Sequence, residues 1–187
     1  MRKLKLQVQI SVDGFVAGPN GEMDWLTFPW TEDIGNYVGA ITEPVDTIIL
    51  GRNLAEGFIP HWASVAADPN HPEQAAGQKF SDTAKVVFSR TLETTKWANT
   101  AVANGDLVTE INSLKQQDGG DIIAYGGVEF VSELIKHDLI DEYHLFVNTT
   151  AMGSGKPIFT GKTRLKLHKA TPFACGIVAL HYQPIRN

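Results

Sequence analysis

Gly126 and Gly127 stand at a corner that could bind a phosphate group. They follow a short apolar segment, Ile122–Tyr125, and precede a segment from Val128 in which apolar residues recur at helical spacing. Two glycines at a strand-to-helix corner let the backbone turn sharply and let a ligand approach closely. The free N–H groups at the start of the helix would face that ligand, which favours a phosphate. A tight turn without any ligand explains the same two glycines, so this corner alone leaves both interpretations open.

Two arginines follow two other apolar segments. Gly51-Arg52 comes after Val45–Leu50, and Ser89-Arg90 comes after Lys85–Phe88. Because the carboxyl ends of parallel strands share one edge of a sheet, the three corners are predicted to converge on one ligand. Each charge-assisted hydrogen bond contributes on the order of 1.5–3 kcal/mol. Two arginine contacts to a ribose 2′-phosphate would therefore favour NADPH over NADH by on the order of a hundredfold or more. Solvent-facing loop arginines are the alternative interpretation.

The elements that must position these corners follow an α/β pattern. Strands alternate with helices over most of the chain, and the last segments are strands without helices between them. This order predicts a mostly parallel central sheet with helices on both faces and antiparallel C-terminal strands. The expected strands are 3–11, 45–50, 85–88, 100–103, 122–125, 141–149, 164–170 and 176–182, and the expected helices are 31–41, 106–116 and 128–137.

The segment 58–80 shows no clear periodicity. It contains Pro60, Pro69 and Pro72 among small and polar residues. We expect a long irregular surface stretch with one short helix near 74–80. Such a stretch could cover a site, although a purely structural loop explains it equally well.

Composition limits the classes of function. The 187 residues fit a single domain, 1–187, with 43% hydrophobic and 20% charged residues. A net charge of -5 argues against general nucleic-acid binding. Cys175 is the only cysteine, and no segment approaches membrane-spanning length, which favours the cytoplasm. The six histidines show no paired ligand spacing, and His144 falls within a strand, so no metal centre is expected.

Five motifs in order resemble one known family. They are Ser11-Val12-Asp13-Gly14-Phe15-Val16-Ala17, Gly51-Arg52, Val86–Leu92, Tyr125-Gly126-Gly127 and Met152–Phe159. This series resembles the dihydrofolate-reductase-like family. More narrowly, it is similar to the reductase domain at the C-terminus of the riboflavin-biosynthesis deaminase-reductase, here without the deaminase.

The resemblance implies NADPH as the cofactor. The adenosine-side phosphates would be held by Gly51, Arg52, Ser89 and Arg90, and the pyrophosphate by Gly126, Gly127 and Val128. Val16 and Ala17 would lie beside the nicotinamide, and Trp25 in the loop that closes over the site. A usual dinucleotide fingerprint of the Gly-x-Gly-x-x-Gly type does not follow the first strand.

The substrate side of the pattern departs from the family. Dihydrofolate reductases carry a carboxylate in the first turn of the helix after the tryptophan. Asp33 has the same place in the first turn of the predicted helix and is the candidate catalytic residue, and Thr31 is the expected helix cap. However, Asp33 stands eight residues after Trp25, three more than in those enzymes. No Lys or Arg occurs between Asn53 and Trp62, where the riboflavin-pathway reductase needs cations for a phosphoribosyl group.

Aromatic residues suggest what the substrate is. Four of them, Trp25, Phe28, Trp30 and Phe58, suggest a flat heterocyclic ligand, and core packing explains them nearly as well. We therefore expect an NADPH-dependent reductase of a pteridine- or pyrimidine-like small molecule. The alternatives are an NADP(H)-binding protein without turnover and a homodimeric scaffold built on the exposed final strands.

Overall fold

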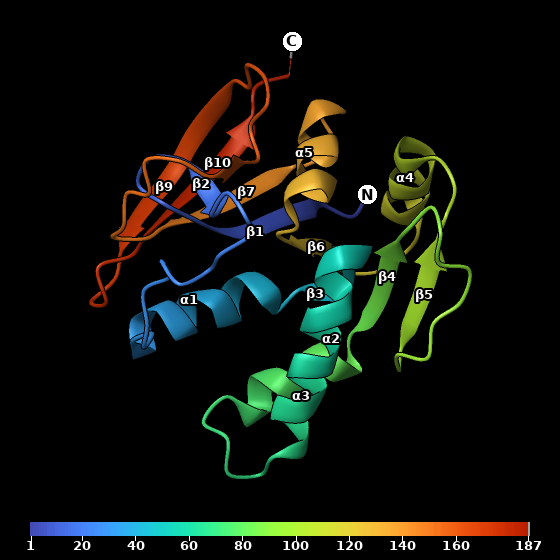
Figure 1. Ribbon diagram of the computed structural model, residues 1–187. Helices are drawn as coiled ribbons and strands as arrows, with labels where there is room; N and C mark the ends of the chain where they lie inside the picture. Colours follow the sequence, from blue (N-terminus) through green and yellow to red (C-terminus); the bar gives the residue numbers. More distant parts are fainter. Residues whose placement is uncertain (187) are drawn as a thin grey trace.

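An eight-stranded sheet forms the centre of the fold (Figure 1). The computed structural model describes residues 1–186. The strand order is β5-β4-β3-β6-β1-β7-β10-β9; the strands from β5 to β7 are parallel, and β10 and β9 are antiparallel. The strands are β1 (Leu4–Ile10), β3 (Val45–Gly51), β4 (Ala84–Phe88), β5 (Thr100–Ala103), β6 (Asp121–Tyr125), β7 (Glu142–Val147), β9 (Leu165–Pro172) and β10 (Val178–Pro184). This confirms the predicted fold class.

Helices cover both faces of the sheet. They are α1 (Glu32–Thr42), α2 (Arg52–Ala67), α3 (Gln74–Asp82), α4 (Leu107–Gln116) and α5 (Val128–Lys136). Figure 1 shows α4 and α5 on one side of the sheet and α1, α2 and α3 on the other. Among residues 1–186, none of the helices has the length and apolar composition needed to cross a lipid bilayer.

Strand β1 illustrates how the sequence produces these two layers. Leu4, Leu6, Val8 and Ile10 are buried in the main core together with Val131 and Leu134 of α5 and Ile111 of α4. The alternate residues Lys5 and Gln7 lie on the other face, where Lys5 Nζ donates to the carbonyl of Ile41 in α1. Alternation with a period of two thus places the apolar set against α4 and α5.

The segment 58–80 is mostly helical, so the predicted irregular stretch was wrong. Arg52 does not close the preceding strand but begins α2, which continues through Pro60 to Ala67. The turn between α2 and α3 contains Pro69 and Pro72. Tight packing accounts for the two helices, because a Cβ at Gly77 would lie 2.7 Å from the backbone N of Ala66. Burial between helices outweighs the local signal of a proline.

Two loops at the carboxyl edge of the sheet are joined by a short second sheet. Strand β2 (Phe15–Ala17) pairs with β8 (Lys156–Pro157) in antiparallel fashion. A Cβ at Gly155 would lie 2.5 Å from the carbonyl oxygen of Ala17. The glycine between β7 and β8 therefore permits the two loops to approach closely.

Candidate functional site

The three corners predicted to converge lie at one edge of the sheet. The register pairs Gly51 at the end of β3 with Phe88 at the end of β4, and it pairs Ile49 of β3 with Ala124 of β6. Across the corners, Arg52 Nη1 donates to the hydroxyl oxygen of Thr91 at 2.6 Å. The segments after β3, β4 and β6 can therefore contact a common ligand, as the sequence analysis predicted.

The glycines at this edge bring backbone close to backbone. Gly126 and Gly127 have φ angles of 55° and 81°, which only glycine adopts without strain. A Cβ at Gly127 would be 3.7 Å from Leu54 Cβ at the start of α2, and one at Gly51 would be 2.8 Å from Phe130 Cβ. The first turn of α5 thus packs directly against the end of β3 and the start of α2.

The N-terminus of α5 offers donors at the same edge. Gly127 is its N-cap and has no side chain to accept from the helix, while the Val131 N–H donates to the Gly127 carbonyl at 2.9 Å. The N–H groups of the first turn, from Val128 onward, have no intrahelical acceptor. Together with the helix dipole they provide the conditions for binding a phosphate.

The two arginines differ in how they are engaged. Arg52 is exposed, and its Nε pairs with Glu56 Oε1 at 2.7 Å in addition to the bond to Thr91. Arg90 is also exposed, and within residues 1–186 its guanidinium has no hydrogen-bond or ion-pair partner. Ser89 shapes the loop after β4 that carries Arg90, because its hydroxyl oxygen accepts from the N–H groups of Thr91 and Leu92. Of the two arginines, Arg90 is therefore the one without a partner among residues 1–186.

Asp13 fastens the loop after β1 to the loop after β7. Its carboxylate accepts from the N–H groups of Met152 and Gly153 and from the Ser11 hydroxyl. The bond from Met152 is the largest of the causes that lower the pKa of Asp13 to about 2. These contacts hold the segment that carries Val16 and Ala17, both of which are buried in β2.

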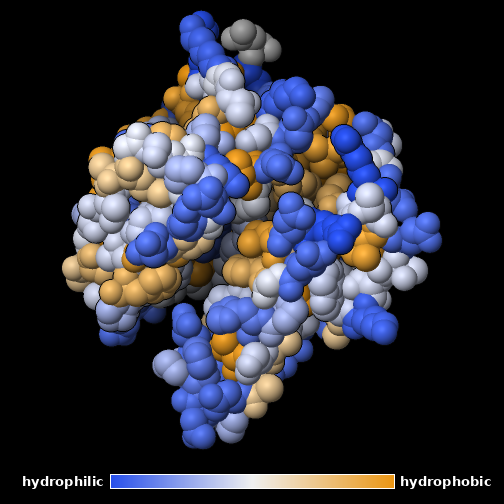
Figure 2. Space-filling model, viewed as in Figure 1, coloured by the Kyte–Doolittle hydropathy of each residue, from blue (hydrophilic) through white to orange (hydrophobic). Residues whose placement is uncertain are grey.

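The surface is hollowed beside this edge. In Figure 2 the hollow lies near the centre of the view, between the parts of the surface formed by α1 and by α2, with apolar groups along its border. Two further depressions lie at the opposite, amino edge of the sheet: one is lined by Arg2 and Arg186 among others, the other by Thr47 and Thr100 among others. Neither of these two depressions is lined by residues of the converging corners.

Comparison with known proteins identifies the family. The family model for the RibD C-terminal domain matches residues 2–179. The chain belongs to the RibD C-terminal domain family. It is 31% identical over 188 residues to the uncharacterised protein YyaP of Bacillus subtilis (strain 168), covering 97% of this chain and 94% of YyaP.

Solved structures place the chain among reductase-like folds. RibD of Acinetobacter baumannii has a TM-score of 0.72 at 19% identity, covering 100% of this chain and 59% of RibD. Dihydrofolate reductase of Enterococcus faecalis, solved with NADP(H), has a TM-score of 0.62 at 14% identity, covering 98% of this chain and 97% of that one. These likenesses show that the chain shares its fold with RibD and with dihydrofolate reductase.

Within this RibD C-terminal domain, the four aromatic residues do not form one cluster. Phe28 is exposed and stacks on Trp30, which stacks on Phe146 of β7. Phe58 instead packs with Trp62, Phe80 and Tyr125 between α2, α3 and β6. Trp25 is buried, and its Nε1 has no hydrogen-bond partner within residues 1–186. The aromatic side chains thus belong to separate groups on different elements of the fold.

Asp33 lies in the first turn of α1, as predicted, but is fully engaged by the chain itself. Its Oδ1 accepts from the Thr31 hydroxyl and the Ile34 N–H, and its Oδ2 accepts from the Ala174 N–H at 2.9 Å. The bond from Thr31 is the largest cause that lowers the pKa of Asp33. Thr31 therefore occupies the N-cap position without capping the helix, contrary to the expectation. Asp33 ties α1 to the loop between β9 and β10.

Asn148 is a positioning residue that the sequence analysis missed. It is 1% exposed, accepts from the Thr27 N–H at 2.8 Å, and donates to Gln9 Oε1 and to the Phe146 carbonyl. It thereby anchors the Trp25-containing loop to β1 and β7. Its position directly after a buried strand was the available signal, because polar residues at strand ends line the ligand-binding edge of a parallel sheet.

Proposed function

We propose that the protein is an NADPH-dependent reductase of a small pteridine- or pyrimidine-like heterocycle. The observation that carries this proposal is the meeting of the corners after β3, β4 and β6 at one edge, next to the uncapped N-terminus of α5 and the free guanidinium of Arg90. The left-handed glycines and the unpaired donors fit the pyrophosphate of a dinucleotide.

The residues of the chain divide the binding of the cofactor between them. Gly126, Gly127 and the N–H of Val128 hold the pyrophosphate, and Arg90, with Arg52 and Ser89, binds the ribose 2′-phosphate. Gly51 leaves room for this approach, because a side chain there would displace Phe130 at the start of α5. When bound, NADPH supplies the hydride.

The loops after β1 and β7 position the reacting groups. Asp13 and Asn148 tether them through backbone N–H groups. In this proposal Val16 and Ala17 border the nicotinamide, and the tethered loops hold the reacting groups in position. Trp25, Phe28 and Trp30 border the substrate on the α1 side of the hollow, and Phe58 supports the α2 side. Asp33 is proposed to relay the proton: after release from the contacts that keep it ionised, its carboxylate takes up a proton from water and passes it to the reduced atom of the substrate.

The substrate proposed here lacks a phosphate. The first part of α2 would face it, and residues 53–62 contain His61 but no Lys or Arg. A phosphoribosyl group would therefore find no permanent cation there. This distinguishes the proposal from the reaction named for the Thermotoga maritima relative, a 5-amino-6-(5-phosphoribosylamino)uracil reductase.

Two measurements on the full chain test the proposal. The first is the affinity for NADPH and NADH, measured by calorimetry. The second is substrate-dependent oxidation of NADPH with dihydrofolate, the phosphoribosylamino-uracil and its dephosphorylated form. We expect tight NADPH binding and turnover of an unphosphorylated heterocycle. Absence of NADPH binding would remove the whole proposal, and preference for the phosphorylated uracil would remove the substrate assignment.

A binding protein without turnover is the second candidate. The engagement of both oxygens of the Asp33 carboxylate favours it, because a carboxylate held as an acceptor stays ionised and carries no proton to transfer to a substrate. Tight NADPH binding without oxidation across the heterocycle panel would support this candidate.

We also infer a cytoplasmic homodimer. Strand β9 forms one edge of the sheet, and Leu167 on it is 49% exposed. An exposed edge strand is a template for pairing with a second copy. The molar mass, measured by light scattering during size-exclusion chromatography, tests this inference. The mass of a monomer at micromolar concentration would contradict it.

A further inference from the structure

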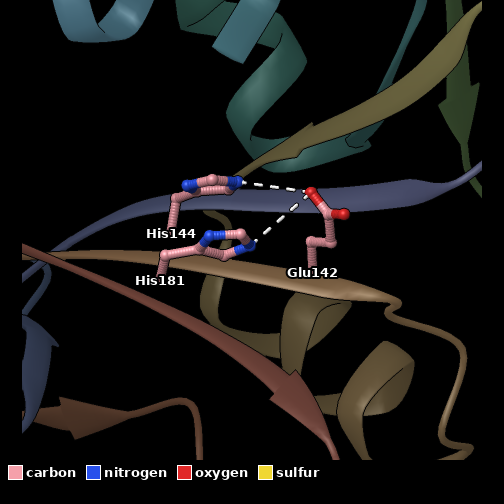
Figure 3. A group of neighbouring side chains, drawn as sticks. All are labelled: Glu142, His144 and His181. Carbon is pink, nitrogen blue, oxygen red and sulfur yellow. Dashed lines mark ion pairs between the residues drawn. The ribbon is translucent and has the colours of Figure 1, made fainter. Parts of the chain in front are cut away.

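Three side chains that bear potential metal ligands converge on β7 and β10. Glu142 and His144 are two residues apart on β7 and so lie on one face, and His181 of β10 is the direct cross-strand partner of His144. The two imidazole rings stack at 4.5 Å with 12° between their planes. Figure 3 shows both rings turned with a nitrogen toward the same carboxylate. Each Nε2 lies 3.7 Å from Glu142 Oε2.

The two imidazole Nε2 atoms are buried and lack partners. Glu142 and His144 are 7% and 3% exposed, and His181 is half-buried. Neither Nε2 has a hydrogen-bond partner within residues 1–186. A separation of 3.7 Å is too long for a hydrogen bond, and a buried polar atom without one costs about 1–3 kcal/mol. Because both Nε2 atoms point toward Glu142 Oε2, one bound atom between the three could be the missing partner of both nitrogens.

The other contacts of the cluster orient these atoms. His144 Nδ1 lies 3.1 Å from the Tyr37 hydroxyl of α1, and Glu142 Oε1 accepts from Lys3 Nζ at 2.8 Å. When Nδ1 of His144 donates to Tyr37, its Nε2 carries a lone pair. That lone pair then faces the free Glu142 Oε2. The lone pair of the His144 Nε2 and the negative Glu142 carboxylate repel each other. A cation bound between them would be coordinated by both and would remove this repulsion.

We propose that Glu142, His144 and His181 form a binding site for a divalent transition-metal ion of the zinc class. Two imidazole nitrogens and one carboxylate oxygen are donors that such ions accept, whereas Mg²⁺ and Ca²⁺ take oxygen ligands. All three ligand atoms already lie within 4.8 Å of one another. In a tetrahedral zinc site with bonds of about 2.0–2.1 Å, ligand atoms are about 3.3–3.5 Å apart. The two nitrogen-to-carboxylate separations of 3.7 Å need only a few tenths of an ångström of contraction.

Binding requires a rotation of one ring. A metal lies near the plane of each imidazole that binds it, so the stacked rings must tilt apart. The side chain of His181 is 24% exposed and is the ring with freedom to move, whereas His144 is held by Tyr37. Water completes the coordination from the exposed side of His181. The ion would fasten β10 to β7, and this role is independent of the proposed reductase activity.

Local charge moderates the affinity. Lys3 lies on the other oxygen of Glu142, and Lys5 lies farther along β1 but is paired with Asp121 at 2.8 Å. The positive charge of Lys3 opposes a second cation nearby, while its hydrogen bond keeps Oε2 directed at the imidazoles. Replacing Lys3 with Met is therefore not a clean test, and the ligands themselves must be changed.

The experiment uses the full chain without an affinity tag, freed of metal by a chelator and then titrated with ZnCl₂ in a calorimeter. We expect one zinc ion per chain for the wild type. His181→Ala and Glu142→Gln should weaken binding by more than tenfold, and Tyr37→Phe by about 10–100-fold, because the group that orients a metal-bound imidazole is lost. The control His61→Gln, in an exposed histidine of α2, should bind like the wild type.

A second readout guards against variants that fail to fold. Zinc should raise the melting temperature of the wild type and of His61→Gln but not that of His181→Ala, since a ligand stabilises only the state that binds it. Co²⁺ in place of zinc should give the absorption bands of a tetrahedral nitrogen and oxygen site. No zinc binding by the wild type, or equal binding by His181→Ala, would overturn the proposal.

Discussion

Gly51 and Phe130 are in such close contact that a Cβ at position 51 would lie 2.8 Å from the Phe130 Cβ. This contact sets the distance between the end of β3 and the first turn of α5. Real Cβ atoms do not approach so closely, so any side chain at position 51 would push α5 away from the sheet edge. The geometry of the proposed pyrophosphate site depends on that glycine.

Gly51→Ala should therefore destabilise the protein by about 1–3 kcal/mol, the usual cost of overpacking, and weaken NADPH binding. Gly57→Ala is the matched control, because a Cβ at Gly57 in α2 meets nothing within 4 Å. The control should be stabilising by about 0.5–1 kcal/mol, since glycine is unfavourable within a helix. Urea unfolding measures both variants. Equal stability of Gly51→Ala and the wild type would show that the contact relaxes without cost.

Arg90→Ala should weaken NADPH about 10–150-fold and leave NADH nearly unchanged, since one charge-assisted hydrogen bond contributes about 1.5–3 kcal/mol. Arg52→Ala should have a smaller effect, because Arg52 is already paired with Glu56. Calorimetry with both cofactors measures the difference, with Lys162→Ala as a surface control. Equal losses for NADPH and NADH would remove the 2′-phosphate assignment.

Asp33→Asn should slow reduction and leave NADPH affinity intact. The amide oxygen of Asn can still accept from the Ala174 N–H, so the tether between α1 and the β9–β10 loop is retained. Asp33→Ala removes that acceptor and should also lower the free energy of unfolding. Steady-state rates and urea unfolding separate the two roles. An unchanged rate for Asp33→Asn would refute a catalytic role. The residue would then serve only to hold α1 against the β9–β10 loop through the Ala174 N–H.

Phe28 and Phe58 should respond differently to truncation. Phe28 is 65% exposed, so Phe28→Ala should change stability by no more than about 0.5 kcal/mol. Phe58 packs on Trp62, Phe80 and Tyr125, so Phe58→Ala should cost about 2–4 kcal/mol, somewhat below the cost for a fully buried phenylalanine. A raised KM for Phe28→Ala at unchanged stability would assign it to substrate binding. A stable Phe58→Ala variant would contradict its packing role.

Asp13 should make stability depend on pH in the acid range. Its pKa in the folded protein is lowered to about 2 from an ordinary value of 3.8, chiefly by the Met152 N–H. A lowered folded-state pKa means that the contribution is present above pH 3.8 and is lost as pH falls toward 2. The stability difference between the wild type and Asp13→Ala should therefore shrink over that range. A difference independent of pH would exclude the carboxylate as its cause.

The local pattern of the chain was sufficient to predict the sheet and the meeting of three corners at its carboxyl edge. In a parallel sheet the carboxyl ends of the strands lie at the same edge. The convergence therefore followed from predicting parallel strands that end at Gly51-Arg52, Ser89-Arg90 and Gly126-Gly127. The antiparallel strands β9 and β10 were also expected, because no helix separates the last segments of the chain. Local signals worked here because period-two and helical patterns reflect burial on one face.

Three features were decided only by tertiary structure. The helix α2 runs through Pro60 because α3 packs against it at Gly77, a contact that no local rule contains. Asp33 has the sequence position of a catalytic carboxylate, but the Ala174 N–H from 141 residues away occupies it. His144 and His181 meet only because β10 pairs with β7 in one particular register. In each case the partner lies far along the chain, and its approach depends on packing rather than on spacing.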